Sequence, residues 1–291
     1  MSSSRTDTSP ERVWGGAYPP RRRRVKVGFG REPSALGALR GRLADRASGR
    51  DAADGVGGVG TLVYAGPAMR FDPEELDETR IHHLIVDSIV PRPIAWVSTV
   101  NEDGSSNLAP FSFFTGICPD PPLCLLAIAP REGADGRPEP KDTLRNAART
   151  RELVIHAVPE RALAAMNQSS FDYPYGADEL ALLGLATLPA ERIRGVRIAA
   201  APIAMECAVE RIVDVGDGPT SLVVCRILLW HVDDAILVAG RIDPDRLGAI
   251  GRMGTSTYAR TAERVTLRRP RSGDWEPPPG APQVAGGVRE Q

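Results

Sequence analysis

Residues 87–116 read DSIVPRPIAWVSTVNEDGSSNLAPFSFFTG, and the organisation of the remaining chain is best understood from this stretch. Two apolar runs, Ile94–Val100 and Asn107–Phe114, flank the turn cluster Asn101–Gly104. β-Branched and aromatic residues on both sides of a cluster of Asn, Asp and Gly are typical of a β-hairpin. The sequence therefore predicts two paired strands here.

The two predicted strands carry small hydroxyl residues where a core would be filled by Val or Leu. These residues are Ser98 and Thr99 on the first strand and Ser112 on the second. Hydroxyl groups can donate and accept hydrogen bonds, and neighbouring aromatic side chains such as Phe113 offer flat apolar surface. The combination predicts a ligand-binding surface built from strands.

The composition is that of an ordinary globular protein. The 291 residues are 42% hydrophobic and 25% charged, and the net charge is −1. This balance gives no electrostatic case for nucleic acid or membrane as a partner, and no run of about 18 apolar residues predicts a transmembrane helix. The cysteines form no C-x-x-C pair, so we interpret them as reduced thiols of a cytoplasmic protein. They are Cys118, Cys124, Cys207 and Cys225.

Both ends of the chain lack a regular hydrophobic pattern. Residues 1–68 are rich in Ser, Arg, Gly and Pro and are predicted to be a disordered extension. The run Arg21–Arg24 is followed by no apolar segment that would make it an export signal, and it lacks the interleaved aromatic residues of a nucleic-acid site. Because patterned sequence begins at Met69, we hypothesise that translation starts there and that residues 1–68 come from an over-extended reading frame. Residues 268–291 are predicted to be a disordered tail.

Between these ends, residues 69–267 are predicted to form one domain that is mainly β with a few helices. Leu123–Ala129 is an apolar run of strand length. Ala204–Val215 and Ser221–Val232 alternate apolar and polar residues and are joined by a Gly-Asp-Gly turn, which predicts a second hairpin. Many strands with few helices favour a barrel over a doubly wound sheet.

The predicted helix Thr143–Thr150 begins with a candidate phosphate site. Lys141, Asp142 and Thr143 lie at its start. A helix N-terminus presents unpaired N–H groups and partial positive charge, and a lysine and a hydroxyl there add further donors. A plain capped helix is the alternative interpretation, because Asp142 or Thr143 can serve as the N-cap.

Three blocks in order resemble the flavin reductase-like, FMN-binding split-barrel family. They are PRPIAWVST at 91–99, NLAPFSFF at 107–114 and KDTLRN at 141–146. The segment RMGTSTYAR at 252–260 is similar to the closing Arg/Gly/Tyr segment of that family, with Thr255 where a second glycine is common. The resemblance spans Met69 to Arg260 and implies a split β-barrel that binds FMN.

The resemblance also implies a chemistry. NADH or NADPH would give hydride to the flavin, which would pass electrons to oxygen, ferric iron, a second flavin or a small organic acceptor. No catalytic side chain and no metal are expected, because the flavin carries the electron chemistry. A homodimer with the flavin near the subunit boundary is implied as well. The residues that the resemblance assigns to FMN binding are Ser98, Thr99, Asn107, Ala109, Ser112, Phe113, Lys141, Asp142 and Thr143.

Other functions are less well supported by the residues. A non-enzymatic FMN carrier or storage protein remains open. A haem-handling relative is disfavoured because none of the four histidines has the setting of an axial ligand. The sequence contains no H-E-x-x-H metal motif, no G-x-x-x-x-G-K-[ST] phosphate loop and no G-x-S-x-G nucleophile elbow. Hydrolase and nucleotide-kinase functions therefore lack their motifs.

Overall fold

The structure is a computed structural model that describes residues 69–216 and 220–269. The predictions for residues 1–68 and 270–291 lie outside these residues. The chain divides into two units between Ile81 and His82. In the first unit, the described part contains the 3-10 turn η1 (Pro73–Glu75), and its N-cap Asp72 accepts a hydrogen bond from the Glu74 N–H at 3.0 Å.

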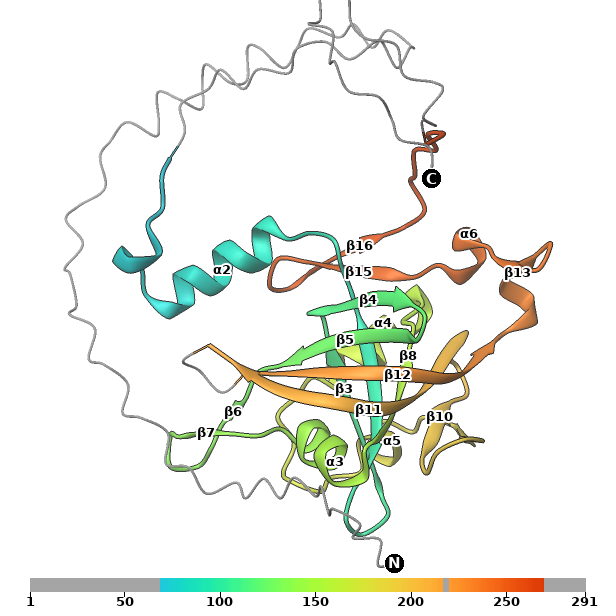
Figure 1. The fold of residues 1–291 in the computed structure, drawn as a ribbon, viewed down its shortest axis with the longest axis horizontal. Helices are drawn as coiled ribbons and strands as arrows, with labels where there is room; N and C mark the ends of the chain where they lie inside the picture. The colour runs from blue at the N-terminus through green and yellow to red at the C-terminus, as the bar shows by residue number, and fades with distance from the viewer. Residues whose placement is uncertain (1–68, 217–219, 270–291) are drawn as a thin grey trace, which may run out of the picture. The chain divides into compact units, whose positions relative to one another are not determined.

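Seven antiparallel strands form the main sheet of the second unit (Figure 1). Their order across the sheet is β3-β2-β8-β11-β12-β5-β4. The long pair β11 and β12 occupies the middle and spans 13 residues in each strand. The bounds are β2 Ala95–Val100, β3 Ser106–Phe111, β4 Phe114–Pro119, β5 Pro122–Ile128, β8 Glu152–His156, β11 Ile203–Val215 and β12 Thr220–Val232.

The sheet is curled because its two edge strands, β3 and β4, follow one another in the chain. Only Ser112 and Phe113 lie between the end of β3 and the start of β4. A two-residue connection between opposite edges forces those edges close together at this point. The sheet order is nevertheless open, with no pairing between β3 and β4, as in a barrel that is split along one side.

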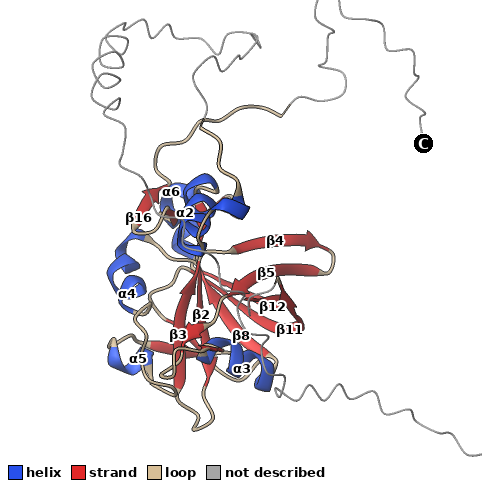
Figure 2. Ribbon diagram, turned by 90° about the vertical axis from the view of Figure 1, so that its left-hand side faces the viewer, coloured by secondary structure: helices blue, strands red, loops and turns tan. Residues whose placement is uncertain are grey.

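Short elements complete the second unit. A three-stranded sheet combines β1 (Arg92–Pro93), β15 (Ile250–Met253) and β16 (Thr257–Arg260). Figure 2 shows α4 and α5 on one side of strands β2 and β3. The three small hairpins are β6 Arg131–Glu132 with β7 Pro138–Glu139, β9 Thr187–Pro189 with β10 Val196–Ile198, and β13 Leu237–Val238 with β14 Arg241–Ile242. The helices are α2 Glu78–Ser88, α3 Asp142–Thr150, α4 Leu163–Gln168, α5 Glu179–Leu182 and α6 Pro244–Leu247, with 3-10 turns η2 Glu160–Ala162 and η3 Asp234–Ile236.

Strand β2 is buried on both faces and separates two hydrophobic clusters. Ala95 and Val97 pack into the cluster inside the curled sheet, which α3 covers with Leu144. Trp96 belongs to the second cluster, which includes residues of α4 and α5. Burial on both faces explains why this strand reads as a nearly continuous apolar run.

The predicted central hairpin is confirmed. Thr99 pairs with Asn107 across β2 and β3, and the Asn101 N–H donates to the carbonyl of Ser105 at 2.9 Å to close the turn. Gly104 takes φ +89°, a left-handed conformation that favours glycine. The predicted second strand, residues 107–114, is too long. The chain leaves β3 after Phe111, because it must cross to the opposite edge of the sheet to begin β4.

The remaining strand predictions hold. The two strands predicted on either side of the Gly-Asp-Gly turn are β11 and β12, which pair, while residues 217–219 of the turn lie outside the described residues. The run at 123–129 corresponds to β5. The predicted helix at 143–150 is α3, which begins one residue earlier. None of the helices in the described parts of the chain is long and apolar enough to cross a membrane.

All four cysteines are free thiols, and three of them lie deep in the sheet. Cys124 on β5 is directly opposite Cys225 on β12, and Cys207 lies on the neighbouring strand β11. These three side chains are at most 1% exposed. Cys118 is only partly buried, and its thiol donates to the carbonyl of Pro121 at 3.1 Å.

Candidate functional site

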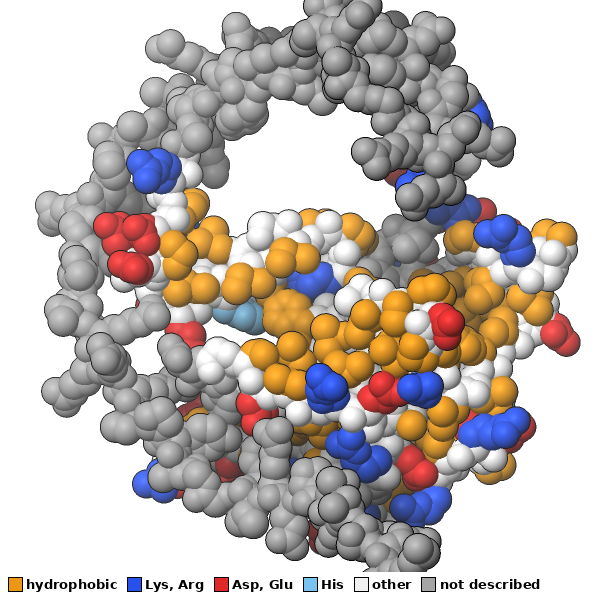
Figure 3. All heavy atoms as spheres, in the orientation of Figure 1, with side chains coloured by type: hydrophobic (Ala, Val, Ile, Leu, Met, Phe, Trp, Pro, Cys, Tyr) orange, Lys and Arg blue, Asp and Glu red, His pale blue; other side chains and the backbone are white. Residues whose placement is uncertain are grey.

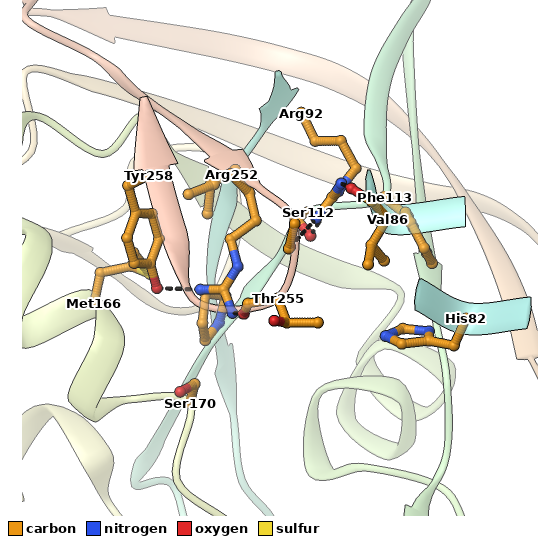
Figure 4. A pocket seen from close by; sticks show the side chains of 13 residues that line it. His82, Val86, Arg92, Ser112, Phe113, Met166, Ser170, Arg252, Thr255 and Tyr258 are labelled. Atoms are coloured by element: carbon orange, nitrogen blue, oxygen red, sulfur yellow. Dashed lines mark hydrogen bonds between the residues drawn. The ribbon is translucent and has the colours of Figure 1, made fainter. Parts of the chain in front are cut away.

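A pocket of about 240 Å³ opens where strand β3 ends (Figure 4). Helix α2, the start of β1, the bend after β3, helix α4 with the residues after it, and the β15–β16 hairpin each contribute to its wall. Segments far apart in the sequence therefore meet around one space. Its lining residues are His82, Val86, Arg92, Ile94, Pro110, Ser112, Phe113, Met166, Ser170, Arg252, Gly254, Thr255 and Tyr258.

Arg92 anchors the wall of the pocket. Its side chain is buried and donates hydrogen bonds to the carbonyls of Val86 and Ile89 in and after α2, and to the carbonyl of Gly254 in the β15–β16 turn. Its Nε–H lies 3.4 Å from the hydroxyl of Ser112. A guanidinium group has five N–H donors in a fixed plane, which lets one residue join three segments. Arg92 is thus a fixed positive charge whose hydrogen bonds are largely made within the protein.

Neighbouring charges act on Arg92 in opposite directions. Loss of hydration lowers the pKa of Arg92, and the nearby positive charge of Arg252 lowers it further, whereas Asp87 raises it. Asp87 lies behind the turn, because a Cβ placed on Gly254 would be 2.8 Å from its Oδ1. The Gly254 backbone has φ +56°, which favours glycine. The positive φ is the reason that glycine is favoured here, because the exposed Asp87 carboxylate can move away from an added Cβ.

The β15–β16 hairpin brings Arg252 and Tyr258 to the pocket. Arg252 donates to the hydroxyl of Tyr258 and to the carbonyl of Thr255, and its guanidinium carbon lies 4.6 Å from the centre of the Tyr258 ring. The Tyr258 hydroxyl in turn donates to Oδ1 of Asn167 at 3.0 Å. Figure 4 shows Arg252 reaching between Tyr258 and Thr255. These contacts hold the guanidinium in one orientation.

Two of the predicted site residues, Ser112 and Phe113, line this pocket. Phe113 is 39% exposed, and the guanidinium carbon of Arg92 lies 5.8 Å from its ring centre. Both residues belong to the bend between β3 and β4, so the same crossing that curls the sheet also places them at the pocket.

The hydroxyl of Thr143 and the amide of Asn107 meet in a buried polar network at the other end of β3. Oδ1 of Asn107 accepts from the hydroxyls of Thr143 at 2.7 Å and Thr99 at 3.1 Å. Its Nδ2 donates to Glu179 at 3.1 Å. Asn146 on α3 donates to the Thr99 hydroxyl at 3.0 Å. The side chains of Thr99, Asn107 and Thr143 are thus satisfied by the protein itself, and they tie α3 and α5 to the central hairpin.

Glu179 is an unusual member of this network because it is a buried carboxyl group whose hydrogen-bond donors in the described part of the chain, the Asn107 amide and the Leu108 N–H, are uncharged. Its Oε2 accepts from the Leu108 N–H at 2.9 Å. Burial raises the pKa of Glu179, although the hydrogen bond from Leu108 lowers it and the nearby Asp142 raises it again. The carboxyl group fixes the backbone of β3 at its most buried point.

Ser98 and Ala109 lie on the paired strands between these two ends. The buried hydroxyl of Ser98 donates to the carbonyl of Val196 in β10 at 2.8 Å. Ala109 is partly buried and pairs with Val97. The Ser98 side chain therefore joins two strands.

Lys141 and Asp142 begin α3 and are partly exposed. Lys141 is the residue before the helix, and its side chain makes no capping hydrogen bond. Asp142 accepts weakly from the Gly176 N–H at 3.4 Å, and loss of hydration raises the pKa of Asp142. Close by, the ring of Tyr175 contacts the guanidinium groups of Arg131 and Arg145, whose carbons lie 3.2 and 3.8 Å from its centre. Arg131 also lies 4.0 Å from the carboxylate of Glu139, so positive and negative side chains are mixed at this end of β3.

Seven of the nine predicted residues lie at the two ends of β3, and Ser98 and Ala109 lie between them. Ser112 and Phe113 are at the pocket, and the group at the other end is Thr99, Asn107, Lys141, Asp142 and Thr143. Sequence reasoning missed the pocket residues that come from elsewhere, above all Arg92, Arg252 and Tyr258. Arg92 stands between two prolines, and Arg252 and Tyr258 lie in the closing segment, so each was visible in a motif. Their convergence depends on the pairing of β1 with β15, which places Arg92 opposite Arg252.

Residues 87–242 match the family model described as "Flavin reductase like domain". The chain belongs to the flavin reductase-like family. The match covers the pocket's Ser112 and Phe113 and the start of α3, while Arg252 and Tyr258 lie beyond it.

Flavin reductase-like proteins of known structure resemble this one over most of its described length. Component B of nitrilotriacetate monooxygenase from Bacillus cereus is 31% identical, with a TM-score of 0.66 over 70% of this chain and 100% of that one. The 2-nitrobenzoate 2-nitroreductase NbaA of Pseudomonas fluorescens is 29% identical, with a TM-score of 0.64 over 73% and 100%. A split-barrel protein of Shewanella frigidimarina NCIMB 400, 20% identical with a TM-score of 0.59 over 70% and 100%, shares the fold. The protein is therefore a split β-barrel.

Proposed function

We propose that this chain is an FMN-dependent oxidoreductase that takes hydride from NADH or NADPH and passes electrons to oxygen, a flavin, ferric iron or a small organic acceptor. The observation that carries the proposal is the position of the pocket, which opens at Ser112 and Phe113 inside the region that matches the family. Bound FMN would supply the electron chemistry. The protein's part is to hold the cofactor, orient it and set the charge around it.

The pocket has the composition that a flavin ring requires. One part of its wall is apolar and offers a surface on which a flat ring system buries its faces. Arg92 provides a fixed positive charge at the same place, and a preorganised cation stabilises negative charge that develops on a bound ligand. The residues of the apolar wall are Val86, Ile94, Pro110, Phe113 and Met166.

The phosphate would lie toward the opposite end of β3. Lys141 stands at the N-terminus of the nine-residue helix α3 with its side chain unused by the cap. Arg145 lies one turn further along α3 and shares the Tyr175 ring with Arg131, whose charge is partly offset by Glu139. Five residues of extended strand separate Asn107 from Ser112, or about 16 Å, so an elongated ligand beside β3 would reach from the pocket toward Lys141. In this arrangement Thr143 and Asn107 support the strand from within.

We further propose that the protein is a cytoplasmic homodimer with the flavin near the subunit boundary. Large apolar side chains remain exposed around the sheet, including Ile117 on β4 at 49% and Trp230 on β12 at 47%. Figure 3 shows hydrophobic side chains gathered over the face that carries β4, β5 and β12. Contiguous apolar surface of this kind is typical of a protein–protein interface. Covering it with a second copy would also shield the neighbouring pocket from water.

The names of similar proteins support an enzyme over a carrier. The Pseudomonas protein is a nitroreductase and the Bacillus cereus protein is a monooxygenase component. Both are redox enzymes or parts of one, and both align over their full length with this chain.

The test is the absorption spectrum of the full-length protein after addition of FMN, followed without oxygen as NADPH or NADH is added. We expect a protein-bound flavin spectrum that bleaches within seconds with one of the two donors. Bound flavin that no donor bleaches would support a carrier and contradict the oxidoreductase. A protein that takes up no FMN would contradict the proposal altogether.

A further inference from the structure

Beyond its apolar wall, the lining of the pocket carries basic side chains. Arg92, Arg252 and His82 belong to the lining, and no Asp or Glu is among the lining residues in the described part of the chain. Asp87, behind Gly254, offsets the charge of Arg92. Arg252 therefore adds a second fixed positive charge to the pocket wall, opposite Arg92.

Arg252 is held in one orientation by the protein, but only some of its N–H donors are used. Its guanidinium has five N–H groups, and two of them are engaged by the carbonyl of Thr255 and the hydroxyl of Tyr258. The structure gives the other three no acceptor among the residues it describes. A planar group held in place with free parallel N–H donors is suited to the two oxygens of a carboxylate or phosphate.

Hydroxyl groups surround the same space. Ser112, Ser170, Thr255 and Tyr258 all line the pocket, and Figure 4 shows Ser170 and Thr255 on the side that Arg252 reaches. The hydroxyls of Ser170 and Tyr258 already donate to Asn167. Those of Ser112 and Thr255 can donate to an anion in addition to the guanidinium. The volume of the whole pocket, about 240 Å³, is below the 300–1,000 Å³ typical of pockets for drug-sized ligands, so only a small group fits on the Arg252 side beside a flavin ring.

We propose that the Arg252 side of the pocket binds the oxyanion group, a carboxylate or a phosphate, of the second reactant, and that Arg252 is the residue that selects it. The inference rests on the proposed function in placing the flavin ring on the apolar wall beside it. It deepens that function by naming the chemical class that approaches the flavin, an anion of about one aromatic ring or one phosphate.

The test compares benzoate with benzamide, its neutral analogue of the same shape. Each is titrated into the full-length protein without FMN by calorimetry, and into the FMN-loaded protein by the change in the flavin spectrum. We expect benzoate to bind at least tenfold more tightly than benzamide, and Arg252→Gln to weaken benzoate binding ten- to hundredfold, because charge-assisted hydrogen bonds are lost. Arg241→Gln, which changes an exposed arginine outside the pocket, should leave benzoate binding unchanged.

The arms of this experiment separate the possible outcomes. Inorganic phosphate that competes with benzoate would identify the phosphate of the electron donor as the source of the anion, whereas benzoate binding without competition would identify a carboxylate acceptor. Equal binding of benzoate and benzamide, or an Arg252→Gln variant that binds benzoate normally, would overturn the inference. Loss of FMN binding in Arg252→Gln would also overturn it, since the flavin itself would then occupy this side. Benzoate binding that depends on Arg252 in a protein that takes up no FMN would leave the inference standing while the proposed function fails.

Discussion

Thr143 and Lys141 are two residues apart at the start of α3, yet the structure predicts opposite consequences when each is changed. The Thr143 side chain is fully buried, and its hydroxyl donates to Asn107 at 2.7 Å. Thr143→Val keeps the shape and removes that donor, while Asn107 retains the hydrogen bond from Thr99. We expect the free energy of unfolding to fall by about 1–2 kcal/mol, which lowers Tm by about 2–8 °C in a domain of this size. FMN affinity should change less than twofold.

Lys141→Gln is the matched change at the surface. Its side chain supports no cap, so stability should change by less than about 0.5 kcal/mol. FMN affinity should fall about tenfold or more, because a charged donor to the phosphate is lost. Urea unfolding and FMN titration of both variants provide the measurements. A Thr143→Val variant with unchanged stability and much weaker FMN binding would refute this assignment, because the hydroxyl would then be a ligand of the cofactor.

Three further predictions concern a buried histidine, the arginine that anchors the pocket wall and a glycine in the β15–β16 turn. Burial lowers the pKa of His156 to about 4, so as pH drops the unfolded chain binds a proton at this residue before the folded protein does. The free energy of unfolding should therefore fall by about 3 kcal/mol between pH 6.5 and pH 4. Urea unfolding across that range should show a shallower decline in His156→Gln. Arg92→Lys cannot reproduce three sets of hydrogen bonds and should lower the free energy of unfolding by about 2–4 kcal/mol; an unchanged Tm would contradict the role of Arg92 as an anchor. Gly254→Ala and Gly240→Ala should both lower Tm in thermal melts, and to a similar extent, because both backbones have positive φ and the exposed carboxylate of Asp87 can move away from a Cβ at Gly254. A much larger loss in Gly254→Ala would contradict this reasoning and show that Asp87 is held in place.

The central hairpin could be predicted because its signals are local. The β-branched and apolar residues of the two strands and the turn at Asn101–Gly104 lie within about 20 residues of chain, and the structure has the hairpin that they predict. The end of β3 could not be predicted in this way. Ser112 and Phe113 read as a continuation of the strand, and they form a bend only because the chain crosses from one edge of a seven-stranded sheet to the other.

The candidate site shows the same limit. A buried threonine such as Thr99 or Thr143 predicts that its hydroxyl makes a hydrogen bond, but the sequence does not identify the partner. In the structure both hydroxyls donate to Asn107. Arg92 and Arg252 are 160 residues apart and meet only through the pairing of β1 with β15. The family resemblance indicated the type of ligand, whereas the three-dimensional arrangement determined which side chains have donors to offer it.

The four cysteines differ in burial, so their reaction with a thiol reagent would show when the sheet opens. Only Cys118 is within reach of a thiol reagent in the folded protein, so it offers a natural point for attaching a single probe. Cys124, Cys207 and Cys225 sit on three adjacent central strands and become reactive only when those strands separate. The labelling rate of the three buried cysteines, relative to that of Cys118, would therefore measure how strongly a bound ligand or a second subunit stabilises the barrel. The measurement needs no substitution in the chain.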